Sequence, residues 1–328
     1  MNLWADSSLA ADFPSGITVR EARARIGALL RQGGIEEAFV EADILLGWLL
    51  DCDRAGLILA AGSKIDNSLR RRLLTSLRRR LGREPLAYII GEWEFWSLSF
   101  AVGPEVLIPR PETELLVEQA LAFARPGSEL PVEARKQAPE KPLRILDLGT
   151  GSGILAVVLA RELAAARVVA LDLSAAALAV ARANALRHGV AARISLVCSH
   201  WLTALRARPL FDLVVANPPY VVRGELANLQ PEVRDFEPRT ALDGGERGLD
   251  DIDELCRTLP PFMRAGALLL MEIGWDQQET VQRLFRANPA FSEVEILPDL
   301  AGHPRIIRCR RCQGTNMTNL RKPVGDHG

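Results

Sequence analysis

Short apolar runs alternate with longer segments of helical periodicity from residue 143 onward. Strands are predicted at 143–148, 167–172, 194–197, 211–216 and 267–273, and helices from about 153 and at 174–189, 249–259 and 277–287. Two further runs, 291–297 and 305–309, are predicted to pair and close the sheet. Strands that are joined through helices lie parallel in one sheet. The pattern therefore predicts an α/β fold with a Rossmann-like, doubly wound sheet.

Helical periodicity dominates the chain from Thr18 to about residue 86. Thr18 and Glu21 have the spacing of a capping box, and Gly33 and Gly34 end the helix that they open. Further helices are predicted at 36–50, 53–60 and 66–82, while residues 1–17 lack periodicity and are interpreted as a loose arm. The sequence predicts a small helical bundle here.

The remaining boundaries follow from changes of composition. Aromatic and β-branched residues from Tyr88 to Val102 predict a β-hairpin, and a stretch rich in Pro, Glu and Lys at 125–142 predicts an exposed insertion. We expect four parts, namely a helical domain at 1–86, a hairpin linker at 87–106, an α/β domain at 107–310 and a polar tail at 311–328.

Composition restricts the class of protein. The chain has 328 residues, 48% of them hydrophobic, and a formal net charge of -1, so any attraction to nucleic acid must be local. No apolar run is long enough to span a bilayer, and the first nineteen residues contain no Lys or Arg, unlike a secretory signal. Five scattered cysteines favour reduced thiols. We therefore expect a cytoplasmic protein without membrane association.

One predicted helix has an unusual run of positive charge. It carries Arg70, Arg71, Arg72, Arg78, Arg79 and Arg80, and Arg83 follows it, with no acidic residue between Asn67 and Arg83. Such a run is typical of a solvated face, but it also suits docking to an acidic or RNA-containing partner. The sequence leaves both interpretations open.

The tetrapeptide Asn217-Pro218-Pro219-Tyr220 directly follows the apolar run 211–216. Two consecutive prolines stop a strand and hold Asn217 stiffly at its carboxyl end, where open α/β sheets bind ligands. The Asn217 side-chain carbonyl and the Pro218 carbonyl can accept both protons of an –NH2 group, and the Tyr220 ring can stack on a planar amide. A rigid turn is the simpler interpretation of Asn-Pro alone. In this context we favour a site that holds a planar nitrogen.

A glycine-rich loop joins the strand at 143–148 to the following helix. Its residues are Gly149, Thr150, Gly151, Ser152 and Gly153, and Ile154 stands where a dinucleotide-binding loop would have its third glycine. The spacing G-x-G-x-G favours S-adenosylmethionine over NAD. Asp172, at the end of the next strand, can accept hydrogen bonds from both ribose hydroxyls, or it can simply cap the following helix. Trp201 follows the third strand, where an adenine would lie, although a lone tryptophan is more often part of the core.

Together these motifs resemble the peptide chain release factor glutamine methyltransferases. The resemblance extends from about Thr18 to Arg308 and rests mainly on residues 94–98, 108–114, 147–153, 217–220 and 272–274. It implies a class I S-adenosylmethionine-dependent methyltransferase with a helical N-terminal substrate-recognition domain. By resemblance, residues 149–153, Asp172, Trp201 and Asn217 bind the cofactor, and residues 217–220 receive the substrate glutamine. His200 departs from the acidic residue of many relatives, so we expect altered adenine contacts there.

The resemblance also implies a reaction, a substrate and rival functions. Methyl transfer to the side-chain nitrogen (N5) of the glutamine in the GGQ motif of class I release factors is expected, with Asn217, Pro218 and Tyr220 as catalytic residues. A ribosomal-protein glutamine methyltransferase, a DNA adenine-N6 methyltransferase and a non-catalytic RNA adaptor are the alternatives. We expect no direct nucleic-acid substrate. We also expect no metal, since Cys309 and Cys312 alone do not provide four zinc ligands.

Overall fold

The computed structural model describes residues 6–124 and 142–313, which form two compact units. The first comprises Met1–Trp93, Val102–Pro104 and Leu229–Glu237, and the second comprises the remainder. The predicted insertion at 125–142 and polar tail at 311–328 fall almost entirely outside the described residues. No helix of the described residues is long and apolar enough to cross a membrane.

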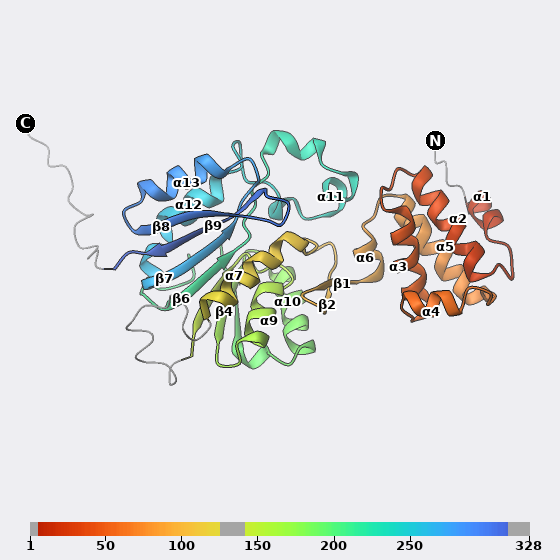
Figure 1. Ribbon diagram of the computed structural model, residues 1–328, viewed down its shortest axis with the longest axis horizontal. Helices are drawn as coiled ribbons and strands as arrows, with labels where there is room; N and C mark the ends of the chain where they lie inside the picture. The colour runs from red at the N-terminus through yellow and green to blue at the C-terminus, as the bar shows by residue number, and fades with distance from the viewer. Residues whose placement is uncertain (1–5, 125–141, 314–328) are drawn as a thin grey trace, which may run out of the picture. The chain divides into compact units, whose positions relative to one another are not determined.

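The first unit is built from short helices around one apolar core. Their bounds are α1 Asp6–Asp12, α2 Val19–Gln32, α3 Ala38–Leu50, α4 Arg54–Leu59, α5 Asn67–Leu81 and α6 Leu86–Ile90 (Figure 1). The predicted capping box is confirmed, because the Thr18 hydroxyl accepts from the Glu21 N–H while the Glu21 carboxylate accepts from the Thr18 N–H. The prediction of a loose arm at 1–17 is wrong from Asp6 onward, where α1 begins. Leu9 and Phe13 are buried in the core, so burial rather than periodicity orders α1.

The prediction of a strand at Tyr88–Ile90 is also wrong. These residues form the helix α6, which begins after Pro85 and ends at Gly91 in the left-handed conformation, with φ of 84°. The hairpin starts only afterwards, with β1 Glu92–Phe95 and β2 Leu98–Ala101. Trp96 and Ser97 between them both have φ of 54°, as a tight type I′ turn requires.

The arginine run of α5 is used inside the first unit at its carboxyl-terminal end. The Arg80 side chain is almost fully buried and pairs with Glu41 at 2.5 Å and with Glu232 at 2.8 Å. Glu232 lies on α11 (Pro231–Phe236), and its carboxylate also accepts from Arg83 at 2.7 Å. Arg79 forms a two-bond pair with Glu84. Arg80 and Arg83 are therefore part of neither a solvated face nor an open docking face, whereas Arg71, Arg72 and Arg78 are exposed and leave both interpretations open.

The second unit contains a seven-stranded sheet in the order β5-β4-β3-β6-β7-β9-β8. The strands are β3 Arg144–Leu148, β4 Arg167–Asp172, β5 Ile194–Cys198, β6 Phe211–Ala216, β7 Met263–Glu272, β8 Phe291–Pro298 and β9 Pro304–Arg311. The neighbouring strands β5, β4, β3, β6 and β7 pair in parallel, and β9 pairs antiparallel with both β7 and β8. The predicted doubly wound sheet and its closing strand pair are confirmed. β9 extends beyond the predicted end at Cys309 to Arg311, which was predicted as the first residue of the polar tail and is buried.

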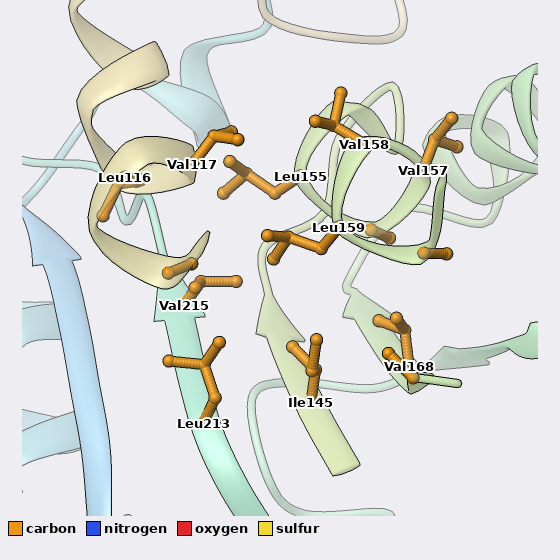
Figure 2. Close-up of a cluster of buried hydrophobic side chains, with 14 of the residues drawn as sticks. Leu116, Val117, Ile145, Leu155, Val157, Val158, Leu159, Val168, Leu213 and Val215 are labelled. Carbon is orange, nitrogen blue, oxygen red and sulfur yellow. The ribbon is translucent and has the colours of Figure 1, made fainter. Parts of the chain in front are cut away.

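Helices cover both faces of this sheet. They are α7 Glu114–Ala124, α9 Ile154–Glu162, α10 Ala175–Arg187, α12 Asp250–Thr258 and α13 Gln278–Ala287. Ile145 and Leu213 point into the core beneath α7 and α9, which Figure 2 shows, whereas their neighbours Leu146 and Val214 belong to the core beneath α12 and α13. Both faces are buried, which explains the continuous apolar runs in the sequence.

Candidate active site

A cavity of about 460 Å³ lies in the second unit where the carboxyl ends of β3, β4 and β6 meet. This volume is within the range of small-molecule and cofactor sites, and the place is where open α/β sheets bind ligands. Of the predicted site residues, it is lined by Gly149, Thr150, Gly151, Ser152, Asp172, Trp201, Asn217 and Pro219. Separate segments of sequence thus converge on one cavity.

All three glycines of the loop are required by the same backbone conformation. Gly149, Gly151 and Gly153 all lie in the left-handed region, with φ of 70°, 54° and 83°. Only glycine adopts this region without steric cost, which explains the spacing G-x-G-x-G. The roles of the glycines then differ. A side chain on Gly149 would meet the Trp201 ring at 3.5 Å, and one on Gly153 would meet Ala181 at 3.0 Å, whereas Gly151 faces open space.

Asp172 holds this loop against the next strand. One carboxylate oxygen accepts from the Gly151 N–H at 2.8 Å, and the other accepts from the Ser174 N–H at 2.8 Å. The side-chain cap of α10 is Ser174 itself, whose hydroxyl accepts from the Ala177 N–H. Each carboxylate oxygen has a second lone pair, so Asp172 can still accept hydrogen bonds from a ligand in the cavity.

Asp147 supports the loop from below and is fully buried. One oxygen accepts from the Thr150 hydroxyl at 2.6 Å and from the Ala156 N–H at 3.2 Å. The other has no hydrogen-bond partner among the described residues. Burial raises the pKa of Asp147 to about 7, against the lowering effect of these hydrogen bonds. Asp147 is therefore a buried group that titrates near neutral pH.

Trp201 and His200 line the cavity, and the Trp201 ring lies beside Gly149 of the glycine loop. The Trp201 indole N–H donates to the Asp251 carboxylate at 2.8 Å, and the residue has an uncommon φ of 42°. Burial raises the pKa of Asp251, and the Trp201 hydrogen bond lowers it. His200 lines the cavity with its ring 3.5 Å from the Glu254 carboxylate. The sequence identified Trp201 but gave no indication of Asp251, which lies fifty residues further along the chain.

Asn217 and Tyr220 are both linked by hydrogen bonds to the buried carboxylate of Glu272. The Asn217 side-chain nitrogen donates to the Thr113 hydroxyl at 3.4 Å, and that hydroxyl donates to Glu272 at 2.8 Å. The Tyr220 hydroxyl donates to the other Glu272 oxygen at 3.2 Å. Burial raises the pKa of both Glu272 and Tyr220. Pro218 and Tyr220 do not line the cavity itself.

The cavity is also lined by residues that were not predicted as site residues, among them the polar or charged Arg110, Thr113 and Asp251. Thr113 lies in the short 3-10 helix Pro111–Thr113, within a segment that carried the sequence resemblance. The sequence therefore marked this segment as functionally important, but it did not indicate the role of each residue in it.

Two family models and several relatives of known name match this chain. Residues 21–91 match the model of the PrmC N-terminal domain, and residues 126–236 match that of the ribosomal protein L11 methyltransferase (PrmA). The release factor glutamine methyltransferase of Moorella thermoacetica is 40% identical, covering 88% of this chain and 97% of its own. That of Bradyrhizobium diazoefficiens is 37% identical, covering 90% and 96%.

A solved structure supports the fold alone. The catalytic domain of hMettl16, in complex with the MAT2A 3'UTR hairpin 6, has a TM-score of 0.50 and 16% identity, and the match covers 76% of this chain and 84% of that chain.

Proposed function

Because the chain belongs to the release factor glutamine methyltransferase family, we propose that it transfers a methyl group from S-adenosylmethionine to the side-chain nitrogen of the GGQ glutamine in class I release factors. The observation that carries this proposal is the convergence of Asn217, the glycine loop and Asp172 on one cavity, in a chain that is 40% identical to a curated family member over nearly its whole length.

The described residues fit S-adenosylmethionine. Gly151 leaves room for close approach to the backbone, Asp172 keeps lone pairs for ribose hydroxyls, and Trp201 supplies an apolar wall for an adenine. A sulfonium methyl group is the electrophile that this cofactor supplies when bound. The protein then needs to hold the two reactants in line and to exclude water.

Asn217 is suited to orient the substrate amide. A glutamine –NH2 group carries two protons, and the Asn217 and Pro218 carbonyl oxygens would accept them. The nitrogen lone pair is conjugated with its own carbonyl, with a rotation barrier of roughly 18–20 kcal/mol in the related peptide bond. Holding both protons favours the geometry in which that lone pair points at the methyl group, and stacking of the Tyr220 ring opposes rotation. The proton leaves after transfer, when the nitrogen is acidic, so no strong base is needed.

The helical unit is proposed to recognise the body of the release factor. It matches the PrmC N-terminal domain and is a compact unit distinct from the one that contains the cavity. On this proposal, kcat/KM for an intact release factor exceeds that for a short peptide with the GGQ motif. Equal values for the two substrates would contradict a recognition role.

Mass spectrometry tests the reaction directly. The full-length protein is incubated with a labelled methyl donor and, separately, a release factor, the same factor with its GGQ glutamine changed to alanine, ribosomal proteins, and duplex DNA. We expect label on the GGQ glutamine only. Label on a ribosomal-protein glutamine or on adenine would replace the proposed substrate with one of the rivals, and cofactor binding without turnover would indicate a non-catalytic protein.

A further inference from the structure

Two segments that are far apart in the sequence meet directly behind Asn217. Thr113 lies between β2 and α7, and Glu272 is the last residue of β7, 159 positions later. Each is 1% exposed. The Thr113 hydroxyl lies between the Glu272 carboxylate at 2.8 Å and the Asn217 amide at 3.4 Å. The two residues therefore form a short polar connection that ends at the predicted catalytic side chain.

Counting protons determines the direction of this connection. The Thr113 hydroxyl donates its single proton to the Glu272 carboxylate, and the nearby positive charge of Arg305 favours the ionised form of that carboxylate, which only accepts. The Thr113 oxygen can then only accept a hydrogen bond from Asn217. Consequently the –NH2 group of Asn217 faces Thr113, and its carbonyl oxygen faces away. That orientation presents an acceptor, which is what a substrate –NH2 group requires.

The same carboxylate also holds the aromatic residue of the motif. The second oxygen of Glu272 accepts from the Tyr220 hydroxyl at 3.2 Å. Arg305 acts on both Glu272 and Tyr220 as a nearby positive charge, and Glu112 acts on Glu272 as a negative one. One buried acceptor thus orients the amide and the ring on either side of the two prolines.

We propose that Thr113 and Glu272 are positioning residues for methyl transfer, which turn the Asn217 carbonyl oxygen toward the reacting amide nitrogen and hold Tyr220 in place. The proposal rests on the proposed glutamine methyltransferase function and extends it to two residues outside the Asn-Pro-Pro-Tyr motif. Neither residue needs to touch the substrate, because each acts through Asn217 or Tyr220.

The first test replaces the Thr113 hydroxyl with a methyl group. Thr113→Val keeps the shape but leaves the Asn217 –NH2 group without its acceptor, so the amide rotates and presents a donor instead. We expect kcat on a release factor to fall about tenfold or more, with the dissociation constant of S-adenosylmethionine changed by less than about threefold. Thr113→Ser retains the hydroxyl and should restore most of the kcat. Thr280→Val, at an exposed threonine of α13, is the matched control and should behave like the wild type.

The second test exchanges the two polar groups. In N217D, two carboxylates compete for the one Thr113 proton. In the double variant N217D/E272Q, the new amide at 272 can donate to Thr113, whose proton then serves the carboxylate at 217, and the total charge is that of the wild type. We expect the double variant to be several times more active than N217D. A purely structural role for Glu272 predicts that the second change lowers activity further.

The outcomes separate the two proposals. Wild-type protein that leaves the release-factor glutamine unmethylated overturns the proposed function and, with it, this inference. Wild-type turnover together with an unchanged kcat in folded Thr113→Val overturns only the positioning role. A double variant that is no more active than N217D overturns the hydrogen-bond direction, even if Thr113→Val is slow.

Discussion

Removing the Asp172 carboxylate should weaken cofactor binding without unfolding the second unit. Both of its oxygens accept backbone N–H groups at 2.8 Å, each has a second lone pair, and the residue lines the cavity. Two hydrogen bonds from ribose hydroxyls to a charged acceptor contribute about 1.5–3 kcal/mol each. The lower end of this range amounts to about 3 kcal/mol for the pair. Since about 1.4 kcal/mol corresponds to tenfold, Asp172→Ala should weaken S-adenosylmethionine binding by more than about 100-fold.

Asp212 provides a matched control for this prediction. Its carboxylate likewise accepts a backbone N–H, that of Arg144 at 2.9 Å, and it lies near the start of β6, whereas Asp172 ends β4. Isothermal titration calorimetry of Asp172→Ala and Asp212→Ala, with thermal melts of both, separates loss of a ligand contact from loss of a backbone acceptor. Affinity of Asp172→Ala within threefold of the wild type, or an equal loss in both variants, would refute the reasoning.

Three further predictions concern catalysis, pH and stability. Asn217→Ala should lower the single-turnover methylation rate by about 100-fold or more, and Asn217→Asp should be equally slow, with melting temperatures nearly unchanged; near-normal turnover would contradict the role given to Asn217. The pKa of Asp147, raised to about 7 in the folded protein, means that the folded state binds the proton more tightly than the unfolded chain, so this group's contribution to stability is largest below about pH 4 and is lost as the pH rises toward 7. The unfolding free energy of the wild type minus that of Asp147→Asn, from urea titrations at each pH, should fall across this window, and a constant difference would exclude the raised pKa. Arg80→Ala leaves Glu41 and Glu232 without their buried partner and should lower the unfolding free energy by about 3 kcal/mol, whereas exposed Arg71→Ala should change it by less than about 0.5 kcal/mol.

Local chemistry was enough to predict most of the α/β architecture. All residues of 211–216 except Asp212 are apolar because both faces of β6 are covered. The prolines that follow end the strand because proline has no N–H to donate to a neighbouring strand. The glycine loop was equally legible, since its three left-handed positions require glycine wherever they occur. These features depend on the backbone and its immediate neighbours, which the sequence states directly.

Local propensity failed where burial or a boundary residue decided the outcome. Tyr88–Ile90 favour a strand by composition, yet they form one helical turn between Pro85 and Gly91. The arginines of α5 look like a surface by charge, but Arg80 is buried because Glu41 and Glu232 reach it from distant segments. Neither result follows from periodicity. The first depends on the residues that bound the helix, and the second depends on acidic partners from distant segments.

The sequence by itself determined that Asn217 stands at the end of a strand and that a glycine loop and Asp172 lie at the ends of two others. The direction of the Asn217 amide was decided only by the tertiary structure. It depends on the Thr113 hydroxyl and the Glu272 carboxylate, which are 159 residues apart. Glu272 is brought near the end of β6 because β7 pairs with β6, and Thr113 directly precedes α7, which packs on β7. The physical reason is that a hydrogen bond acts over about 3 Å, so its partners are set by how the sheet is assembled and not by their spacing along the chain.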